Sequence, residues 1–284
     1  MNRRRLTALL LALALLLSLA ACDIGWLFDP SPAPGEGLAV HFIDVGQGDC
    51  ALIEAGGRFM LIDGGERGSE GKVIKYLRRR GVERLDYVVA THPHSDHMGG
   101  LAYGVLEAFP VGTVIAPRFS PDNTPTTQTY ERFLDVVSEL AAKGTAAKYA
   151  RPGDVYAFGE ARFTILGPLK EDGRNYNNDS VIVRMEWQGK AALFMGDAER
   201  TVENALVKEY GEALRSDLLK AGHHGSKTSS NDNFLFMVQP EDAAISCGVG
   251  NSYGHPSAEV LERCKSYGIA VHRTDIEGTV VIYL

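Results

Sequence analysis

The sequence is poor in cysteine, in tryptophan and in basic charge. Only 4 of its 284 residues are cysteine, which is too few for a disulfide scaffold. Its 29 Lys and Arg are outnumbered by 36 Asp and Glu, and the resulting formal charge of -7 excludes a generally basic nucleic-acid coat protein. A local basic groove is still allowed, because electrostatic steering depends on how charge is distributed. The 45% of hydrophobic residues supply ample material for a core and exclude an intrinsically disordered chain.

Residues 1–22 have the pattern of a bacterial lipoprotein signal peptide. Three arginines precede an apolar run over residues 6–19, which is short for a membrane span. The run ends in Leu19-Ala20-Ala21-Cys22, which resembles a lipobox whose cysteine, Cys22, receives the lipid. An uncleaved anchor is the alternative. Either reading predicts an extracytoplasmic protein held at the cell membrane, and removal of residues 1–21 leaves 26 basic against 36 acidic side chains, a charge of -10.

The rest of the chain divides into a tether and one folded domain. Residues 23–37 contain three prolines and several glycines and predict a flexible tether. Residues 38–284 form the predicted hydrolase domain. Its three cysteines, Cys50, Cys247 and Cys264, allow at most one disulfide, and their spacing shows no metal-binding pattern.

Short apolar runs and amphipathic stretches alternate through this domain. Strands are expected at 38–45, 50–54 and 58–63, followed by a helix at 70–80 and an apolar strand at 85–90. The alternation continues to the C-terminus and favours sheets covered by helices. Several strands before the first helix argue against a purely parallel Rossmann sheet. The further expected strands are 111–116, 162–166, 180–187, 190–195, 217–221, 243–246, 270–273 and 279–283, and the further helices are near 130–143, 199–210, 233–238 and 256–267.

Four potential metal ligands lie within six residues directly after the predicted strand at 85–90. They are His92, His94, Asp96 and His97. So many ionisable side chains at the end of a buried strand would desolvate and repel one another without a cation. Alternation along an extended loop turns the first two and the last two in different directions, so one loop can serve two adjacent ions. Imidazole with carboxylate suits Zn²⁺, Mn²⁺ or Fe²⁺ better than Ca²⁺.

Two later segments repeat the arrangement of an apolar strand followed by metal-competent side chains. Asp197 ends the run Phe194-Met195-Gly196-Asp197, and His223 and His224 follow Lys220-Ala221-Gly222. Each segment is weak alone, because aspartates often begin turns. In this order after the first cluster, they form a strong signal for a metal centre.

These residues together resemble the metallo-β-lactamase fold superfamily, whose HxHxDH signature His92 to His97 matches in full. The resemblance implies an α/β fold, the four-layer αββα sandwich, with two divalent metal ions, Zn²⁺ or Mn²⁺, at one edge. It implies that His92 and His94 bind the first ion, that Asp96 and His97 bind the second, and that Asp197 bridges them. One of His223 and His224 completes the second site, and the sequence does not decide which. Asp63 matches an acid that orients a ligand histidine.

The resemblance is closer to one branch, the extracellular hydrolase domain of the ComEC competence protein and its free-standing relatives. It covers nearly all of residues 40–284 and includes 42–49, 91–100, 196–199, 222–229 and 253–256. The superfamily expects another histidine between His97 and Asp197, and this chain has none there. Residues 177–180 occupy that stretch, and Asn178 is assigned with Asp63 as a residue that supports the ligands. The first ion is therefore expected to have fewer protein ligands, which favours Mn²⁺ over Zn²⁺.

The predicted catalytic residues are Asp96, Lys227 and His255. Ser226, Lys227 and Thr228 offer hydroxyls and a cation suited to phosphate oxygens, or they cap the next helix. His255 is assigned as a substrate ligand or proton donor, with a structural turn histidine as the alternative. The loop residues Asp44, Gln47 and Asp49 are expected to be architecture near the pocket.

The leading hypothesis is a membrane-tethered, metal-dependent phosphodiesterase whose substrate is DNA by analogy with the ComEC branch. No aromatic stacking platform can be identified from the sequence. The alternatives are hydrolysis of phosphorylcholine on teichoic acid, of a lactone or of a β-lactam, and a non-catalytic DNA-binding lipoprotein. The lipid on Cys22 makes the membrane a partner, and no protein partner can be inferred.

Overall fold

The computed structural model describes residues 37–284. The predicted signal peptide, the lipid-bearing Cys22 and all of the tether except Gly37 lie outside the described residues. Within residues 37–284, no helix combines the length and apolar character that crossing a membrane requires.

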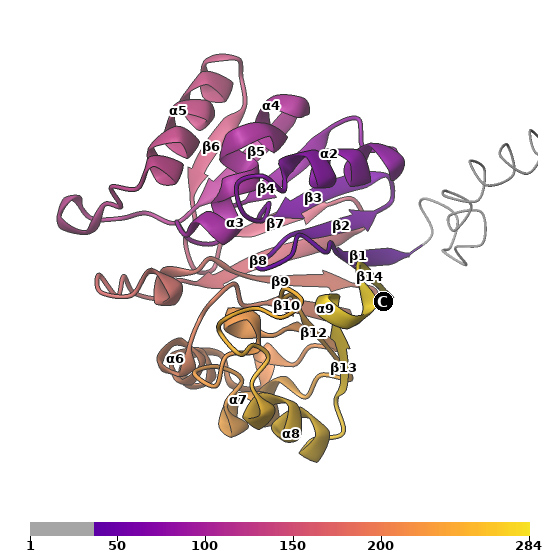
Figure 1. Ribbon diagram of the computed structural model, residues 1–284. Helices are drawn as coiled ribbons and strands as arrows, with labels where there is room; N and C mark the ends of the chain where they lie inside the picture. The colour runs from indigo at the N-terminus through magenta and orange to yellow at the C-terminus, as the bar shows by residue number, and fades with distance from the viewer. Residues whose placement is uncertain (1–36) are drawn as a thin grey trace, which may run out of the picture. The chain divides into compact units, whose positions relative to one another are not determined.

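Two seven-stranded mixed sheets pack face to face (Figure 1). The first sheet has the order β14-β1-β2-β3-β4-β5-β6. Its strands are β1 Leu38–Phe42, β2 Ala51–Ala55, β3 Arg58–Ile62, β4 Leu85–Val89, β5 Val111–Ala116, β6 Ala146–Tyr149 and β14 Val280–Tyr283.

The second sheet has the order β13-β12-β11-β10-β9-β8-β7. Its strands are β7 Val155–Phe158, β8 Ala161–Gly167, β9 Ile182–Trp187, β10 Lys190–Phe194, β11 Leu218–Lys220, β12 Asp242–Ile245 and β13 Ala270–Arg273. The C-terminal strand β14 returns to the first sheet and pairs antiparallel with β1.

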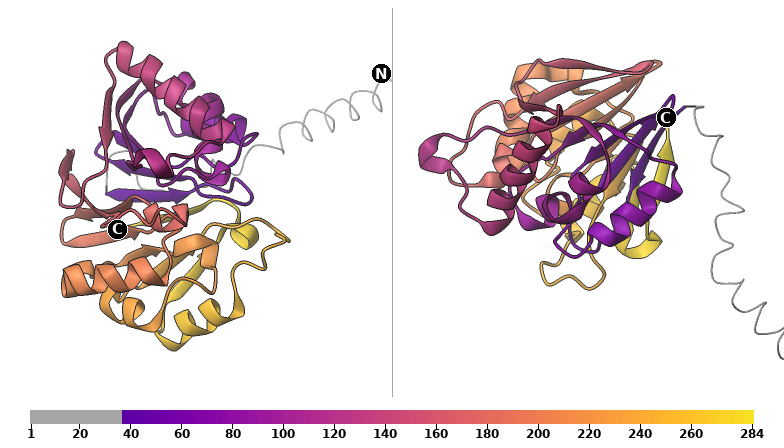
Figure 2. Two further views of the ribbon diagram at one scale, coloured as in Figure 1. Left: turned by 90° about the vertical axis from the view of Figure 1, so that its left-hand side faces the viewer. Right: turned by 90° about the horizontal axis from the view of Figure 1, so that it is seen from above.

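Helices cover the outer face of each sheet (Figures 1 and 2), which confirms the predicted four-layer αββα sandwich. The first sheet carries α2 Glu70–Arg79, α3 Ser95–Gly100, η2 Leu101–Val105, α4 Leu106–Ala108 and α5 Gln128–Ala142. The second carries α6 Arg200–Tyr210, α7 Asp232–Val238 and α8 Ala258–Ser266. Shorter turns are η3 Pro121–Asn123, η4 Tyr176–Asp179, η5 Gly211–Leu214, η6 Gly222–Gly225 and the single-turn helix α9 Thr274–Glu277.

Strands buried on both faces explain the continuous apolar runs of the sequence. In β3, Met60 and Ile62 enter the core between the sheets, whereas Leu61 enters the core under the helices of the first sheet. Successive side chains of a strand point to opposite faces, so a strand between two apolar layers needs apolar residues at every position.

Parallel strands in each sheet place their carboxyl ends along one edge of the sandwich. Strands β3, β4, β5 and β6 run parallel, and so do β10, β11, β12 and β13. Loops after such strand ends are where α/β proteins build their sites. Residues after β4, β10 and β11 therefore meet, although they are far apart in the sequence.

Most predicted elements are present within two residues of their expected ends, and the differences have physical causes. The edge strand β6 and its neighbour in sequence, β7, were not expected. All four residues of β6 are exposed, so its sequence lacks an apolar pattern. The strand expected at 180–187 begins at Ile182, because the turn η4 and its cap Ser180 occupy the preceding residues.

Candidate metal centre

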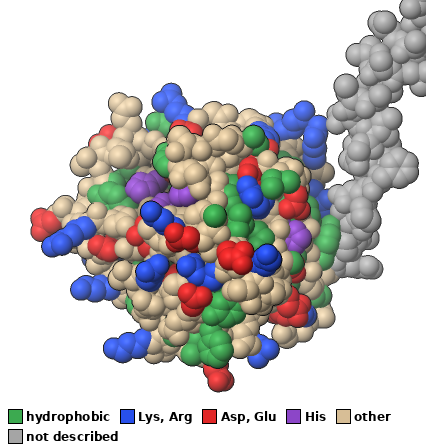
Figure 3. Space-filling model, turned by 60° about the horizontal axis from the view of Figure 1, so that its bottom comes forward, with side chains coloured by type: hydrophobic (Ala, Val, Ile, Leu, Met, Phe, Trp, Pro, Cys, Tyr) green, Lys and Arg blue, Asp and Glu red, His purple; other side chains and the backbone are tan. Residues whose placement is uncertain are grey.

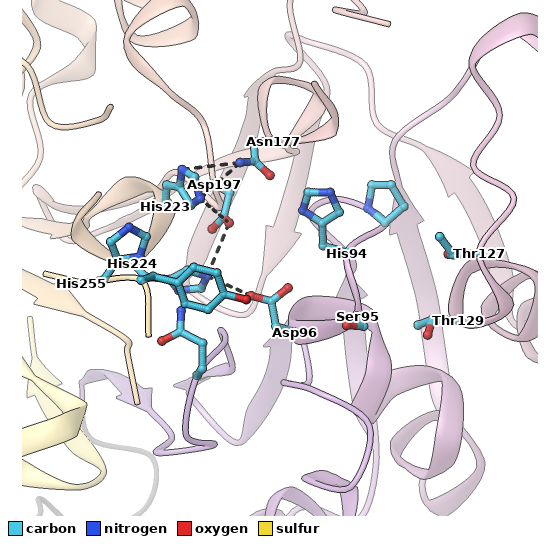
Figure 4. Close-up of a pocket in the computed structure, with 13 residues that line it drawn as sticks. His94, Ser95, Asp96, Thr127, Thr129, Asn177, Asp197, His223, His224 and His255 are labelled. Carbon is cyan, nitrogen blue, oxygen red and sulfur yellow. Dashed lines mark hydrogen bonds and ion pairs between the residues drawn. The ribbon is translucent and has the colours of Figure 1, made fainter. Parts of the chain in front are cut away.

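Five of the seven predicted ligands line one open cavity of about 410 Å³ at the edge of the sandwich (Figure 4), and the other two, His92 and His97, are fully buried beside them. They come from the loop after β4, from α3, from the loop after β10 and from the turn η6 after β11. The cavity is lined by Gln47, Pro93, His94, Ser95, Asp96, Thr127, Thr129, Asn177, Asp197, His223, His224, Tyr253 and His255.

His92 and His94 form the first half of the centre. Nε2 of His92 lies 3.1 Å from Nδ1 of His94 and 3.8 Å from Oδ2 of Asp197. His92 is fully buried, and Oγ1 of Thr91 lies 3.1 Å from its Nδ1. Nε2 of His92, Nδ1 of His94 and the carboxylate of Asp197 are therefore close enough together to bind one cation.

Asp96, His97 and His224 form the second half. Nε2 of His97 lies 3.2 Å from Oδ1 of Asp197 and 3.4 Å from Nε2 of His224. Nε2 of His224 lies 3.2 Å from Oδ2 of Asp96 and 3.4 Å from Oδ2 of Asp197. Asp197 contacts both halves.

The structure separates the roles of the two neighbouring histidines. Nδ1 of His224 lies 2.9 Å from the carbonyl oxygen of Ser246 and 3.2 Å from Oδ1 of Asp49, so Nδ1 carries the proton and Nε2 is free to bind an ion. His223 instead lies at the cavity wall, where Nδ1 is 3.2 Å from Oε1 of Glu199. Of the two, only His224 belongs to the buried cluster whose ligand atoms could hold a metal ion.

The backbone at these two histidines is held in an unfavourable conformation. His223 has φ 47° and His224 has φ 52°, both in the left-handed region that non-glycine residues rarely adopt. Gly222 makes this turn possible, since a Cβ there would lie 2.5 Å from the carbonyl oxygen of Ala198. Strain of this kind is characteristic of functional sites.

Asp63 lies directly behind His97. Its Oδ2 accepts from Nδ1 of His97 at 2.8 Å and from Oγ1 of Thr91 at 2.6 Å, and its Oδ1 accepts from the backbone N–H of Thr91 at 2.8 Å. This carboxylate fixes the ring and turns Nε2 of His97 toward Asp197.

The electrostatics of the second half call for a positive charge. Burial lowers the pKa of His97, but the carboxylates of Asp197, Asp96 and Asp63 outweigh it and raise that pKa well above the usual value. Burial also opposes ionisation of His224, whose pKa is nevertheless raised well above the usual value by Asp197 and Asp49. Carboxylates that hold protons on two facing imidazoles will hold a metal cation in the same place.

The residues present fit a divalent metal ion. Ligand atoms of Asp49, His97, Asp197 and His224, all buried, lie within 4.8 Å of one another. Oδ1 of Asp197 is buried without a hydrogen-bond partner in the part of the chain that the structure describes. Asp49 faces Lys220, whose Nζ lies 2.7 Å from its Oδ2, so within this group it positions His224. Asp197 and His224 line the cavity, and His97 is fully buried beside them.

The structure does not bring every predicted site residue into the cavity. Lys227 is exposed, lines a separate surface depression with Arg200 and Glu259, and is absent from the cavity wall. Oγ of buried Ser226 lies 3.0 Å from Oγ1 of Thr228, and Thr228 contacts Nδ1 of His223 at 3.3 Å. These hydroxyls support the histidine turn, and they are absent from the cavity wall.

Two other predicted residues lie close to the ligands with different contacts. His255 lines the cavity, and its ring stacks at 6.4 Å from that of His224. Asn178 donates to Asp172 at 2.8 Å and accepts from the backbone N–H of Glu199 at 3.2 Å, so it holds the loops behind the cavity. Its neighbour Asn177 lines the cavity instead.

Sequence reasoning missed the roles of three side chains around His223 and His224, namely Asp49, Glu199 and Lys220. Asp49 was expected to be loop architecture, yet it is buried against His224 and paired with buried Lys220. Glu199 supports His223. The available signal was position in the sequence. Lys220 stands three residues before His223, Glu199 stands two residues after Asp197, and Asp49 ends a glycine turn.

The family follows from the sequence match once this geometry is in view. The chain matches the family described as Metallo-beta-lactamase superfamily over residues 43–249. It belongs to this superfamily. The metallo-β-lactamase fold protein YhfI from Bacillus subtilis superposes with a TM-score of 0.55 over 87% of this chain and 99% of that one, at 12% identity, which shows the shared fold alone.

Curated relatives place this superfamily member near proteins of bacterial competence. ComE operon protein 3 of Bacillus subtilis (strain 168) is 30% identical over 277 residues, covering 91% of this chain and 34% of that protein. Competence protein ComA of Neisseria gonorrhoeae is 32% identical over 254 residues, covering 88% of this chain and 33% of that protein. The chain therefore spans about a third of the length of these relatives.

Proposed function

We propose that this protein is an exported, membrane-tethered hydrolase that uses two divalent cations to cleave phosphodiesters, with DNA as the substrate. The observation that carries the proposal is the convergence of two ligand groups on Asp197, His92 with His94 on one side and Asp96, His97 and His224 on the other. Two cations bound there would lower the pKa of a water molecule toward neutrality and neutralise the charge that develops on a phosphate.

The open side of the cavity suits an anion once cations are bound. The lining acids are Asp96 and Asp197, both of which face the ligand cluster, whereas His223 and His255 form the wall around them. Acidic and basic side chains are interspersed on the face drawn in Figure 3, so that face shows no broad basic field. Attraction of a phosphodiester therefore depends on the bound cations.

A stacking residue stands at the mouth of the cavity. Tyr253 is 69% exposed, lines the cavity and stacks on His255 with ring centroids 5.8 Å apart. Asn251 braces this loop, because its side chain donates to the carbonyl oxygens of Gly248 and His255 and accepts from the His255 N–H. Proteins that bind single-stranded nucleic acid offer exposed aromatic rings on which the bases stack, beside groups that hold the phosphates. The similarity to competence proteins points the same way.

The test uses the purified full-length protein loaded with Mn²⁺ or Zn²⁺. We expect hydrolysis of bis-p-nitrophenyl phosphate and of a single-stranded oligonucleotide, both abolished by EDTA and by Asp197→Ala. Tyr253→Ala should raise KM for the oligonucleotide about ten-fold, because it removes one stacking contact worth ~1–3 kcal/mol. Tyr253→Phe keeps the aromatic ring and should leave KM unchanged. Failure to cleave either substrate contradicts the proposal, and cleavage of the small ester alone restricts it to other phosphodiesters.

The membrane tether is proposed from residues 1–22 and is tested separately. Cells expressing the intact chain should hold it in the membrane fraction with a labelled fatty acid attached. Cys22→Ala should prevent this labelling. Recovery of an unlabelled wild-type protein in the cytoplasm would contradict both the export and the anchor.

A further inference from the structure

Asn177 holds a buried polar atom that the hydrogen bonds of the protein do not satisfy. It lies in the turn η4, and the chain has no histidine between His97 and Asp197. Its side chain is 7% exposed and lines the cavity. Among the residues that the structure describes, its Oδ1 has no hydrogen-bond partner.

The hydrogen bonds of His223 fix which end of the Asn177 carboxamide faces the cavity. Nδ1 of His223 lies 3.2 Å from the carboxylate of Glu199, so that nitrogen carries the proton and Nε2 is an acceptor. Nδ2 of Asn177 lies 3.3 Å from this Nε2 and donates to it. The oxygen must then point away from His223, and Figure 4 shows the carboxamide between His223 and His94 with its nitrogen on the His223 side.

A buried carbonyl oxygen without a donor is destabilising, and native proteins keep few of them. A cation satisfies such an oxygen directly. Asn177 shares the cavity wall with His94 and Asp197 of the first half of the metal centre, where these two and His92 supply only three protein ligands.

We propose that Asn177 is a ligand of the first metal ion through Oδ1, in place of the missing histidine. This inference rests on the proposed two-cation function. Replacement of an imidazole nitrogen by an amide oxygen makes the first site harder, so it favours Mn²⁺ over Zn²⁺ compared with a three-histidine site. Glu199 fixes the ring of His223, and His223 in turn accepts the hydrogen bond that orients the Asn177 carboxamide. His223 therefore acts on this ion only through Asn177.

The experiment counts bound metal and does not depend on activity. Full-length protein is stripped with a chelator and titrated with Mn²⁺, and free Mn²⁺ is measured by electron paramagnetic resonance. Wild type should bind two equivalents. Asn177→Ala should keep one tight equivalent, held by Asp96, His97, Asp197 and His224, and bind the other at least about ten-fold more weakly, since loss of a mere supporting residue already costs about 10–100-fold.

Three further variants separate loss of a metal ligand from misfolding. Asn177→Asp preserves the oxygen and should bind two equivalents. Asn123→Ala is the matched control, because the Asn123 side chain donates to Oγ of Ser120 and does not line the cavity, and this variant should also bind two equivalents. Asn177→His should bind two equivalents of Zn²⁺ and lose the relative preference for Mn²⁺.

Each result decides between the two claims. Two equivalents with unchanged affinity in Asn177→Ala would overturn the role of Asn177 and leave the proposed function standing. If Asn177→Asp also lost the second equivalent of Mn²⁺, the role of the Asn177 oxygen as a ligand would be overturned. Fewer than two equivalents in wild type would overturn both the inference and the two-cation function.

Discussion

Asp63 illustrates how one buried carboxylate controls a metal ligand from behind. It accepts three hydrogen bonds, one from His97 and two from Thr91, and burial raises its pKa although His97 opposes the rise. Asp63→Asn removes the charge and lets the amide donate to Nδ1 of His97, which turns the proton onto the wrong ring nitrogen. We expect Mn²⁺ affinity to fall by about 10–100-fold at the second site. Calorimetric titration checks this, and unchanged affinity would show that Asp63 serves packing alone.

Glu203 is a buried carboxylate away from the metal centre that predicts a pH dependence of stability. It lies in α6 and is fully buried, and burial raises its pKa to about 7 although Asn231 and Ser230 donate to it. In the unfolded chain the same group titrates near 4.5. Between about pH 4.5 and 7 the folded state therefore holds the extra proton, and the free energy of unfolding decreases as pH rises through that window.

Glu203→Gln cannot ionise and should remove this contribution. Urea unfolding from pH 4 to 8 measures it as the difference between wild type and variant. The variant loses an acceptor for Ser230 and Asn231, so it is less stable overall, but the difference from wild type should shrink as pH rises. A constant difference across the window would show that Glu203 keeps an ordinary pKa.

At the level of elements, helix α3 depends on a backbone approach that only glycine allows. A Cβ on Gly100 would lie 2.0 Å from the carbonyl oxygen of Gly64, and one on Gly99 would lie 2.2 Å from the backbone nitrogen of Arg67. This contact seats α3, and with it Asp96 and His97, against the loop that carries Asp63. The N–H of Gly64 bonds to the carbonyl of His97 at 2.8 Å across the same contact.

Gly100→Ala should therefore destabilise the protein by about 1–3 kcal/mol, as over-packing of a close contact does. Gly71→Ala in α2 is the control, because nothing lies within 4 Å of its Cβ position and alanine favours a helix. The control should be as stable as wild type or more so. Denaturant unfolding measures both, and equal stability of the two variants would contradict the close approach.

The strands and helices of the domain could largely be predicted from local patterns, whereas the partners of single site residues could not. The run 85–90 predicted β4, and His92 to His97 predicted a metal cluster after it. The exposed strand β6 lacked any pattern, and Asp49 was misjudged because its partners Lys220 and His224 are brought to it by tertiary folding from more than 170 positions away. The choice between His223 and His224 likewise needed the contacts of their Nδ1 atoms with Glu199 and Ser246.

At the scale of the whole molecule, each half of the sandwich supplies part of the centre. The first sheet delivers His92, His94, Asp96 and His97 after β4, and the second delivers Asp197 and His224 after β10 and β11. Neither sheet alone presents a full set of ligands for two ions. The set of ligands is thus complete only when the two sheets pack face to face.

Hydrolysis as a function of bound metal tests the central claim most directly. Chelator-stripped full-length protein is titrated with Mn²⁺ while cleavage of bis-p-nitrophenyl phosphate is followed. Two cations acting together predict almost no hydrolysis up to one equivalent and a rise to the full rate at two. Full hydrolysis with one equivalent, or none with two, would contradict a two-cation phosphodiesterase.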